Sequence, residues 1–190
     1  MADKLLFVTG NAGKAREIAA ILGTAVERLD LELPEIQALD VAEVARHKAK
    51  TAYARVGRPV IVEDTGLYID ALGGLPGALV RWFLATIGPA GLCALVPPSA
   101  DRTARARTAV AYCDGGEVEV VVGETRGVIV AAPIGAGGFG WDPVFRPDGA
   151  AGTFAELGAA EKDAFSMRRQ ALARLRARLR AAAERRGPHH

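Results

Sequence analysis

The sequence predicts an α/β fold in which a mixed, twisted central sheet is flanked by helices and two lobes surround a cleft. Strand and helix patterns alternate in the first half of the chain, which is typical of strands joined by helices. The second half carries longer strand patterns joined by a glycine-containing turn, which favours antiparallel pairing. A mixed sheet accommodates both halves.

Five elements are expected in the first half. Short apolar runs predict strands, and apolar residues at helical spacing predict helices. Asp40 stands three residues before Glu43, which resembles a capping box and marks the start of a helix. In chain order the expected elements are a strand over 5–9, a helix over 12–22, a strand over 26–33, a helix from Asp40 towards Val56 and a strand over 59–62.

The second half is expected to begin with a tight loop over 73–77, because its glycines and proline favour turns. A helix with Trp82 and Phe83 turned inward should follow over 78–87. The remaining expected elements are hairpin strands over 103–113 and 117–122, a further strand over 125–130 and a C-terminal helix over 168–186.

Length and composition indicate a single domain. The chain has 190 residues, of which 50% are apolar and 24% charged, so one ordered domain is expected over 1–186. Residues 187–190 are expected to be a disordered tail or the remnant of a tag. There is neither a long apolar run nor a signal-peptide pattern, which favours a cytoplasmic protein without membrane contact. The two cysteines, Cys93 and Cys113, have no metal or disulfide spacing.

Arginines gather in the C-terminal helix, although the net charge of the chain is only +2. A basic helix can contact nucleic acid. Leu172, Leu175 and Leu179, however, recur at helical spacing and form an apolar stripe, so the helix is expected to dock on the protein with its arginines in solvent. A nucleic-acid partner is therefore not expected.

The loop from Thr9 to Lys14 joins a strand to a helix and can bind phosphate. Backbone N–H groups at a helix N-terminus favour anions, and Lys14 adds a positive charge. The loop lacks the P-loop spacing, which disfavours that class of nucleotide hydrolase. The structural alternative is an N-cap at Asn11 and a solvated lysine.

Glu63 and Asp64 are adjacent carboxylates after an apolar strand. Two carboxylates held together repel each other unless a cation is present, and Mg²⁺ prefers carboxylate and phosphate oxygens. A magnesium site is therefore predicted here, to which Glu35 can add another oxygen. In the alternative, one carboxylate caps the next loop and the other is solvated.

The segment from Gly138 to Phe145 places two aromatic residues, Phe139 and Trp141, beside Asp142 and flexible glycines. Such a loop can hold a flat base between its rings and read its edge with the carboxylate. A structural loop whose aromatic residue caps the core is the alternative.

Together these segments resemble the inosine/xanthosine triphosphate pyrophosphatases, also called the Ham1-like or inosine triphosphatase family. The resemblance runs from Phe7 to about Leu175 and rests on TGNxxK, VEDTGL with ALGGLPG, FGWDPxFxPDG, TFAEL and EKxxxSxR, which occur in family order. It implies Mg²⁺-dependent hydrolysis of ITP, dITP and XTP to the monophosphate and pyrophosphate by a homodimer, which cleans the nucleotide pool. The cleft of the fold would then bind the nucleotide.

The resemblance also implies a role for each matching residue. Asp64 would activate the attacking water, assisted by Lys14, and Glu35, Glu63 and Asp64 would hold the metal. The residues implied in substrate binding are Thr9, Asn11, Lys14, Lys48, Arg81, Phe139, Trp141, Asp142, Lys162, Met167 and Arg168.

Met167 departs from the family, which usually has histidine there. A histidine can hydrogen-bond a purine edge, whereas a thioether barely can. The preferred base therefore stays open: the same reaction on an adenine-type or modified nucleotide of a biosynthetic pathway is an alternative. A non-catalytic nucleic-acid-binding module that uses the arginine-rich helix is another.

Overall fold

The structure is a computed structural model that describes residues 5–9, 15, 18–19, 21–23 and 25–186. Asn11, Lys14, much of the predicted helix over 12–22 and the predicted tail over 187–190 lie outside the described residues.

A seven-stranded sheet forms the centre of the molecule. Its strands follow the order β2-β1-β3-β5-β6-β7, and β4 pairs with β3. β1 runs parallel to β2 and β3, whereas the remaining pairs are antiparallel, which confirms the mixed sheet. The strands are β1 (Leu5–Val8), β2 (Val26–Leu29), β3 (Val60–Ile69), β4 (Pro76–Gly77), β5 (Thr103–Cys113), β6 (Glu119–Ile129) and β7 (Phe145–Pro147).

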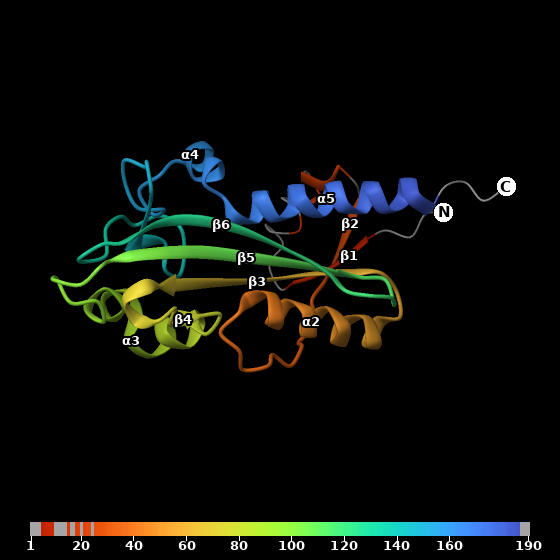
Figure 1. The fold of residues 1–190 in the computed structure, drawn as a ribbon, viewed down its shortest axis with the longest axis horizontal. Coiled ribbons are helices and arrows are strands. Elements are labelled where there is room, and N and C mark those ends of the chain that lie inside the picture. Colours follow the sequence, from red (N-terminus) through yellow and green to blue (C-terminus); the bar gives the residue numbers. More distant parts are fainter. Residues whose placement is uncertain (1–4, 10–14, 16–17, 20, 24, 187–190) are drawn as a thin grey trace.

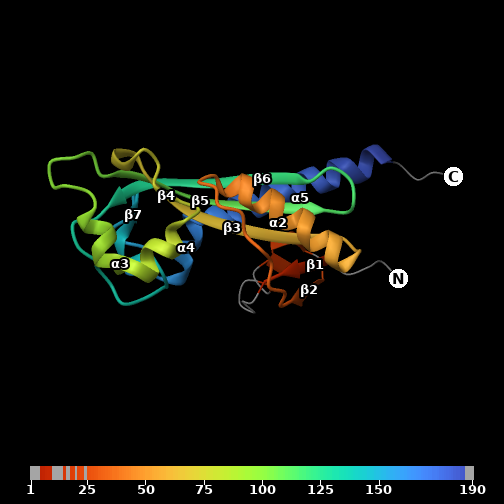
Figure 2. The same cartoon turned by 90° about the horizontal axis from the view of Figure 1, so that it is seen from below.

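Helices cover both faces of this sheet (Figures 1 and 2). Alternate residues of β3 point to opposite faces: Val60 and Val62 pack under one helix, and Ile61 packs under another. The helices are α2 (Val41–Val56), α3 (Val80–Ala94), α4 (Ala159–Ala164) and α5 (Met167–Arg186), with 3-10 turns at Asp70–Leu72 and Asp142–Val144. α2 and α5 are the two that cover opposite faces.

The long strands β3, β5 and β6 join two ends of the molecule (Figure 1). α3, α4, β4 and β7 gather at one end, and β1 and β2 lie at the other (Figure 2). These two groups correspond to the lobes that the sequence predicts.

Two features that the sequence predicts, the cap at Asp40 and the apolar stripe of the C-terminal helix, are present in the structure. The Asp40 side chain accepts a hydrogen bond from the Ala42 N–H at 2.9 Å and so caps α2. α5 docks through the predicted apolar stripe, because Leu172 and Leu175 are fully buried and Leu179 packs beside them. Among the described residues, no helix is long and apolar enough to span a membrane.

Two predicted strand boundaries are wrong. The strand predicted over 59–62 continues to Ile69, because all ten residues of β3 pair with β5. The strands predicted over 117–122 and 125–130 are one strand, β6, which continues through Gly123. A Cβ at Gly123 would lie 1.9 Å from the Met167 carbonyl oxygen, so this glycine permits the close approach of α5 and does not end the strand.

The inward orientation predicted for Trp82 is also wrong, because its side chain is 63% exposed. The helix around it is longer than predicted and reaches Ala94 through a non-helical residue, Gly88, that precedes Pro89. Leu92 and Cys93, in the part beyond this break, supply the most buried contacts of α3, while Phe83 packs only partly against the core.

Candidate functional site

A cleft of about 1170 Å³ opens along the middle of β3. On the side of β3 away from β5, β1 pairs with Val60 and Ile61, and β4 pairs with Leu67 and Tyr68. Among the described residues, no strand pairs on that side between these points. The strand edge is therefore open, and side chains from both faces of β3 reach one cleft.

The cleft collects most of the predicted site residues. They are Glu35, Lys48, Glu63, Asp64, Arg81, Phe139, Trp141, Asp142, Lys162, Met167 and Arg168. Thr9 is not among the described lining residues; its N–H donates to the Leu29 carbonyl at 2.9 Å, at the end of β1. The predicted phosphate loop is thus described only at this one residue, since Asn11 and Lys14 lie outside the description.

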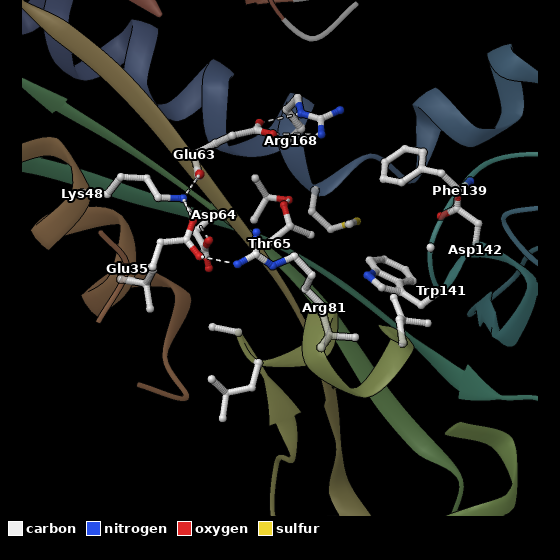
Figure 3. A pocket seen from close by; sticks show the side chains of 18 of the residues that line it. Glu35, Lys48, Glu63, Asp64, Thr65, Arg81, Phe139, Trp141, Asp142 and Arg168 are labelled. Carbon is white, nitrogen blue, oxygen red and sulfur yellow. Dashed lines mark hydrogen bonds and ion pairs between the residues drawn. The ribbon is translucent and has the colours of Figure 1, made fainter. Parts of the chain in front are cut away.

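One group of charges lies on the α2 face of β3. Lys48 on α2 stands 2.6 Å from Glu35 and 3.5 Å from Asp64, and therefore bridges the two carboxylates (Figure 3). Arg81, from the first turn of α3, adds a longer contact of 3.6 Å to Glu35. Two carboxylates and two cations from four segments thus meet at this end of the cleft.

Of the two carboxylates beside Lys48, Asp64 is a weaker acid than Glu35. Its pKa is raised to about 6, first by burial and also by the charges of Glu35 and Glu63, against the opposing effect of Lys48. Its Oδ2 atom is buried and has no hydrogen-bond partner among the described residues. Burial also raises the pKa of Glu35, but the hydrogen bond and charge of Lys48 and the charge of Arg81 outweigh it, so this pKa is lowered.

Glu63 points to the opposite face, where Arg168 of α5 holds both of its oxygens. The Arg168 Nε and one terminal nitrogen donate to Glu63 at 2.7 and 3.2 Å, and both side chains are largely buried. The expectation that Glu63 and Asp64 are held together at a strand end is therefore wrong. Both lie within β3, where consecutive side chains diverge, and they pair with different cations, Glu63 with Arg168 and Asp64 with Lys48.

The aromatic end of the cleft is built on Asp142. Its Oδ2 accepts the Phe139 N–H at 2.9 Å and the Lys162 ammonium at 2.5 Å. Gly138 has φ +73°, and a Cβ there would lie 2.1 Å from Asp142 Oδ2, so only glycine fits this turn. The carboxylate thereby fixes the loop that carries the aromatic residues.

The two aromatic residues of this loop differ in exposure. Phe139 is 67% exposed and offers a free ring face, with the Lys162 Nζ atom 5.5 Å from its centroid. Trp141 is buried and packs edge-on against Phe145, with ring centroids 5.7 Å apart. Both interpretations of this segment, a base-binding loop and a loop that caps the core, therefore apply to Trp141, which packs on the core and also lines the cleft.

The described residues contain no cluster of three or more side chains of the kinds that bind metal. Mg²⁺ needs only one or two carboxylates when substrate phosphates complete its shell. The unpartnered Oδ2 of buried Asp64, with Glu35 beside the same lysine, fits this requirement. Glu63 fits it only after Arg168 has released its carboxylate.

The lining residues that sequence reasoning missed include Thr65, Thr108 and Trp82. Strand alternation could have found Thr65, because it shares a face with Glu63, two residues earlier. Thr108 lies opposite Thr65 in the β3–β5 register, which became known only from the structure.

Known proteins are similar to this chain over nearly its whole length. The Ham1 family model matches residues 5–178. Inosine triphosphate pyrophosphatase 2 of Trypanosoma cruzi is 48% identical over 178 residues, which cover 92% of this chain and 91% of that protein. A dITP/XTP pyrophosphatase of Pyrobaculum aerophilum is 46% identical over 175 residues, with coverage of 90% and 94%.

Solved structures share the fold. The crystal structure of a nucleoside-triphosphatase / dITP/XTP pyrophosphatase from Mycobacterium abscessus has a TM-score of 0.76 at 33% identity and covers 91% of this chain and 98% of its own. A HAM1 protein from Coxiella burnetii has a TM-score of 0.82 at 26% identity, with coverage of 94% and 98%.

Proposed function

Because this chain belongs to the Ham1 family, we propose that it hydrolyses ITP, dITP and XTP to the nucleoside monophosphate and pyrophosphate. One observation carries the proposal: a single cleft joins a charged end around Asp64 to an aromatic end around Phe139. The first end suits phosphates and the second a base. The names of the two relatives, inosine triphosphate pyrophosphatase and dITP/XTP pyrophosphatase, support this choice of substrates.

Asp64 is the proposed general base. A carboxylate with a pKa near 6 accepts a proton from water more readily than an ordinary aspartate. Asp64 would deprotonate the water molecule that attacks the α-phosphorus. Lys48 and Arg81 lie where they would neutralise the triphosphate, and Thr9, Asn11 and Lys14 are further proposed phosphate ligands.

Mg²⁺ is the proposed cofactor. When bound, it would neutralise charge on the pyrophosphate leaving group and polarise the phosphoryl oxygens. Asp64 and Glu35 would hold the ion at the α2 face. Glu63 would become a further ligand once Arg168 has released its carboxylate. Lys48 then has to give up part of its present contact with the two carboxylates.

The purine base of the nucleotide would lie against the free ring of Phe139. Lys162 and Asp142 fix this loop, Arg168 supplies donors for a 6-oxo group, and Met167 and Trp141 add apolar walls. Because Met167 offers no strong hydrogen bond, the same reaction on another base is the second candidate function. Discrimination of the base would then be weaker than a polar wall allows.

We also infer a cytoplasmic homodimer whose protomer is one domain over 1–186. The resemblance to the family supports the dimer, and the exposed side chains of Trp82 and Ile87 on α3 offer apolar surface for it. Sedimentation of the purified protein measures its mass, and a monomer at all concentrations would rule the dimer out.

The products test the proposed function. The protein is incubated with ITP, XTP, dITP, ATP and GTP, and products are separated by ion exchange. Monophosphate plus pyrophosphate is expected, fastest with ITP, dITP and XTP, and EDTA should abolish turnover. Diphosphate plus orthophosphate as the main products would instead place the protein among the phosphatases. Salt-dependent oligonucleotide binding without any hydrolysis would favour a binding module.

A further inference from the structure

Tyr68 lies on β3 four residues after Asp64, on the same face of the sheet. The function proposed above gives it no role, although its side chain is only 7% exposed and fully hydrogen-bonded. The Tyr68 hydroxyl donates to the Leu39 carbonyl at 2.8 Å and accepts the Val41 N–H at 2.9 Å. Tyr68 therefore holds the main chain on both sides of Asp40, the residue that caps α2.

The Leu39 carbonyl joins three segments. It also accepts the Ala78 N–H at 3.0 Å, where the chain passes from β4 into α3. Gly77 has φ +58°, and a Cβ there would lie 2.6 Å from the Leu39 oxygen, so glycine permits this close approach. The end of the loop over 30–40 is thus fixed to β3 and to the start of the helix that carries Arg81.

Glu35 lies on the part of this loop that has few other constraints. In the part of the chain that the structure describes, no backbone N–H or carbonyl of residues 33–38 has a backbone hydrogen bond. The nearest fixed points are the Glu32 carbonyl, which accepts from a side chain of α2, and Leu39. The ion pair of Glu35 with Lys48 would compete with a bound Mg²⁺. The two ends of the loop then set how close Glu35 stays to the carboxylate on β3.

We propose that the Tyr68 hydroxyl positions Glu35 for Mg²⁺ by fixing the loop over 30–40 between β3 and the start of α2. This inference rests on the proposed function, in which Glu35 and Asp64 hold the ion. Tyr68 is a positioning residue, because it is not among the residues that line the cleft. Without its hydroxyl, binding of the ion would have to order the loop, which weakens binding.

The test measures binding of a non-hydrolysable ITP that has a methylene group between its α- and β-phosphorus atoms. Calorimetry gives the Kd of this analogue in Mg²⁺ and in EDTA. Tyr68→Phe should weaken binding roughly three- to tenfold in Mg²⁺, the effect of one hydrogen bond. In EDTA, where Glu35 holds no ion, the parent and the variant should bind equally. An equal loss in both conditions, or no loss in either, would overturn the inference.

A double variant shows whether Tyr68 acts through Glu35. In the Glu35→Gln background, Tyr68→Phe should cause no further loss in Mg²⁺, because the ligand that it positions is already changed. A full further loss would mean that Tyr68 acts on another part of the site.

Arg102→Lys is the matched control for a general loss of stability. Arg102 donates to main-chain carbonyls as Tyr68 does, but it does not line the cleft. Its replacement should leave both affinities unchanged. A loss in Mg²⁺ equal to that of Tyr68→Phe would mean that weakened folding is the cause.

Gly77→Ala disturbs the same junction from the other side, so the inference stays testable even if Tyr68→Phe does not fold. The added Cβ would press on the Leu39 oxygen, and the loss should again occur in Mg²⁺ and not in EDTA. An affinity in Mg²⁺ equal to that of the parent would overturn the inference.

Hydrogen exchange separates this inference from the proposed function. If the parent does not bind the analogue in either condition, the proposed function fails. The amides over 33–41 should still exchange faster in Tyr68→Phe than in the parent, because the loop has lost a fixed end. Unchanged exchange over these residues would show that Tyr68 does not fix the loop, whatever the protein hydrolyses.

Discussion

At the scale of a single residue, the environment of Asp64 has opposite effects on the stability of the fold and on the proposed activity. Its burial raises the pKa to about 6, and its Oδ2 atom has no partner, so the folded protein holds a carboxylate in an unfavourable place. The same features make it a good base and a good cation ligand. Activity and stability should therefore respond in opposite directions when its charge is removed.

Asp64→Asn preserves the shape of the side chain but removes the proposed base. Turnover of ITP should fall by roughly two to four decades, the usual loss for a general base. Steady-state assays at saturating Mg²⁺ measure it, with circular dichroism to check folding. Activity within threefold of the parent would show that another group activates the water.

The same substitution should stabilise the metal-free protein at high pH. The folded pKa lies above the ordinary 3.8, so the stability that the bound proton contributes is full below about pH 4 and is lost as the pH rises through about 6. Asparagine has no such loss. The unfolding free energy of the variant relative to the parent should rise from near zero at pH 4 to about 3 kcal/mol at pH 8.

Urea unfolding in EDTA at both pH values measures this difference. Asp148→Asn, at an exposed position, should stay within about 0.5 kcal/mol of the parent throughout. A gap between Asp64→Asn and the parent that does not depend on pH would contradict the assigned cause.

Met167→His should sharpen the choice of base. Met167 is 8% exposed and lines the cleft next to Arg168, so an imidazole there could pair with a purine edge. The ITP to ATP ratio of kcat/KM should rise several-fold, on the order of 1 kcal/mol for one hydrogen bond. Met167→Leu should leave the ratio unchanged. An unchanged or lower ratio with histidine would show that selectivity rests elsewhere.

Arg102 links two elements at the end of the molecule away from β1. Its guanidinium donates to carbonyls of Cys93 and Val96 near the end of α3, and to those of Ile129 and Val130 at the end of β6. A lysine has one compact ammonium group and cannot satisfy all of these acceptors.

Arg102→Lys should therefore destabilise the fold by about 1 to 3 kcal/mol. At about 2–4 °C per kcal/mol for a protein of this size, the melting temperature should fall by roughly 2–12 °C. Differential scanning calorimetry measures it against Arg126→Lys, whose side chain is mostly exposed. Equal melting temperatures of the two variants would mean that the carbonyls find other donors.

The elements also show what sequence reasoning could and could not reach. Local patterns predicted α2 and the docked face of α5, because a cap and an apolar stripe depend on neighbours in the chain. The length of β3 depends on pairing with β5, some forty residues later, and no local pattern encodes that.

The candidate site divides in the same way. Motifs identified the residues that reach the cleft, but not the partners they have there. That Glu63 binds Arg168 and Asp64 faces Lys48 follows from strand alternation combined with the placement of α2 and α5 on opposite faces. The exposure of Trp82 follows from the position of the cleft, which is a tertiary feature.

At the scale of the whole molecule, the cleft is bordered by helices that pack on opposite faces of the sheet. Lys48 belongs to α2, whereas Lys162 and Arg168 belong to α4 and α5 across the open edge of β3. A nucleotide that contacts both sides connects them, and a ligand that binds only the folded state stabilises it by mass action.

A non-hydrolysable ITP with a methylene group between its α- and β-phosphorus atoms should therefore stabilise the protein together with Mg²⁺. At one hundred times its Kd the gain is about 2.7 kcal/mol, which raises the melting temperature by roughly 5–10 °C. Tripolyphosphate and inosine each carry only one half of the ligand, so each should give a smaller rise at the same concentration. Thermal melts with the three ligands test this. If tripolyphosphate with Mg²⁺ matched the whole nucleotide, the aromatic end of the cleft would contribute no binding, and Phe139 would not be part of a base site.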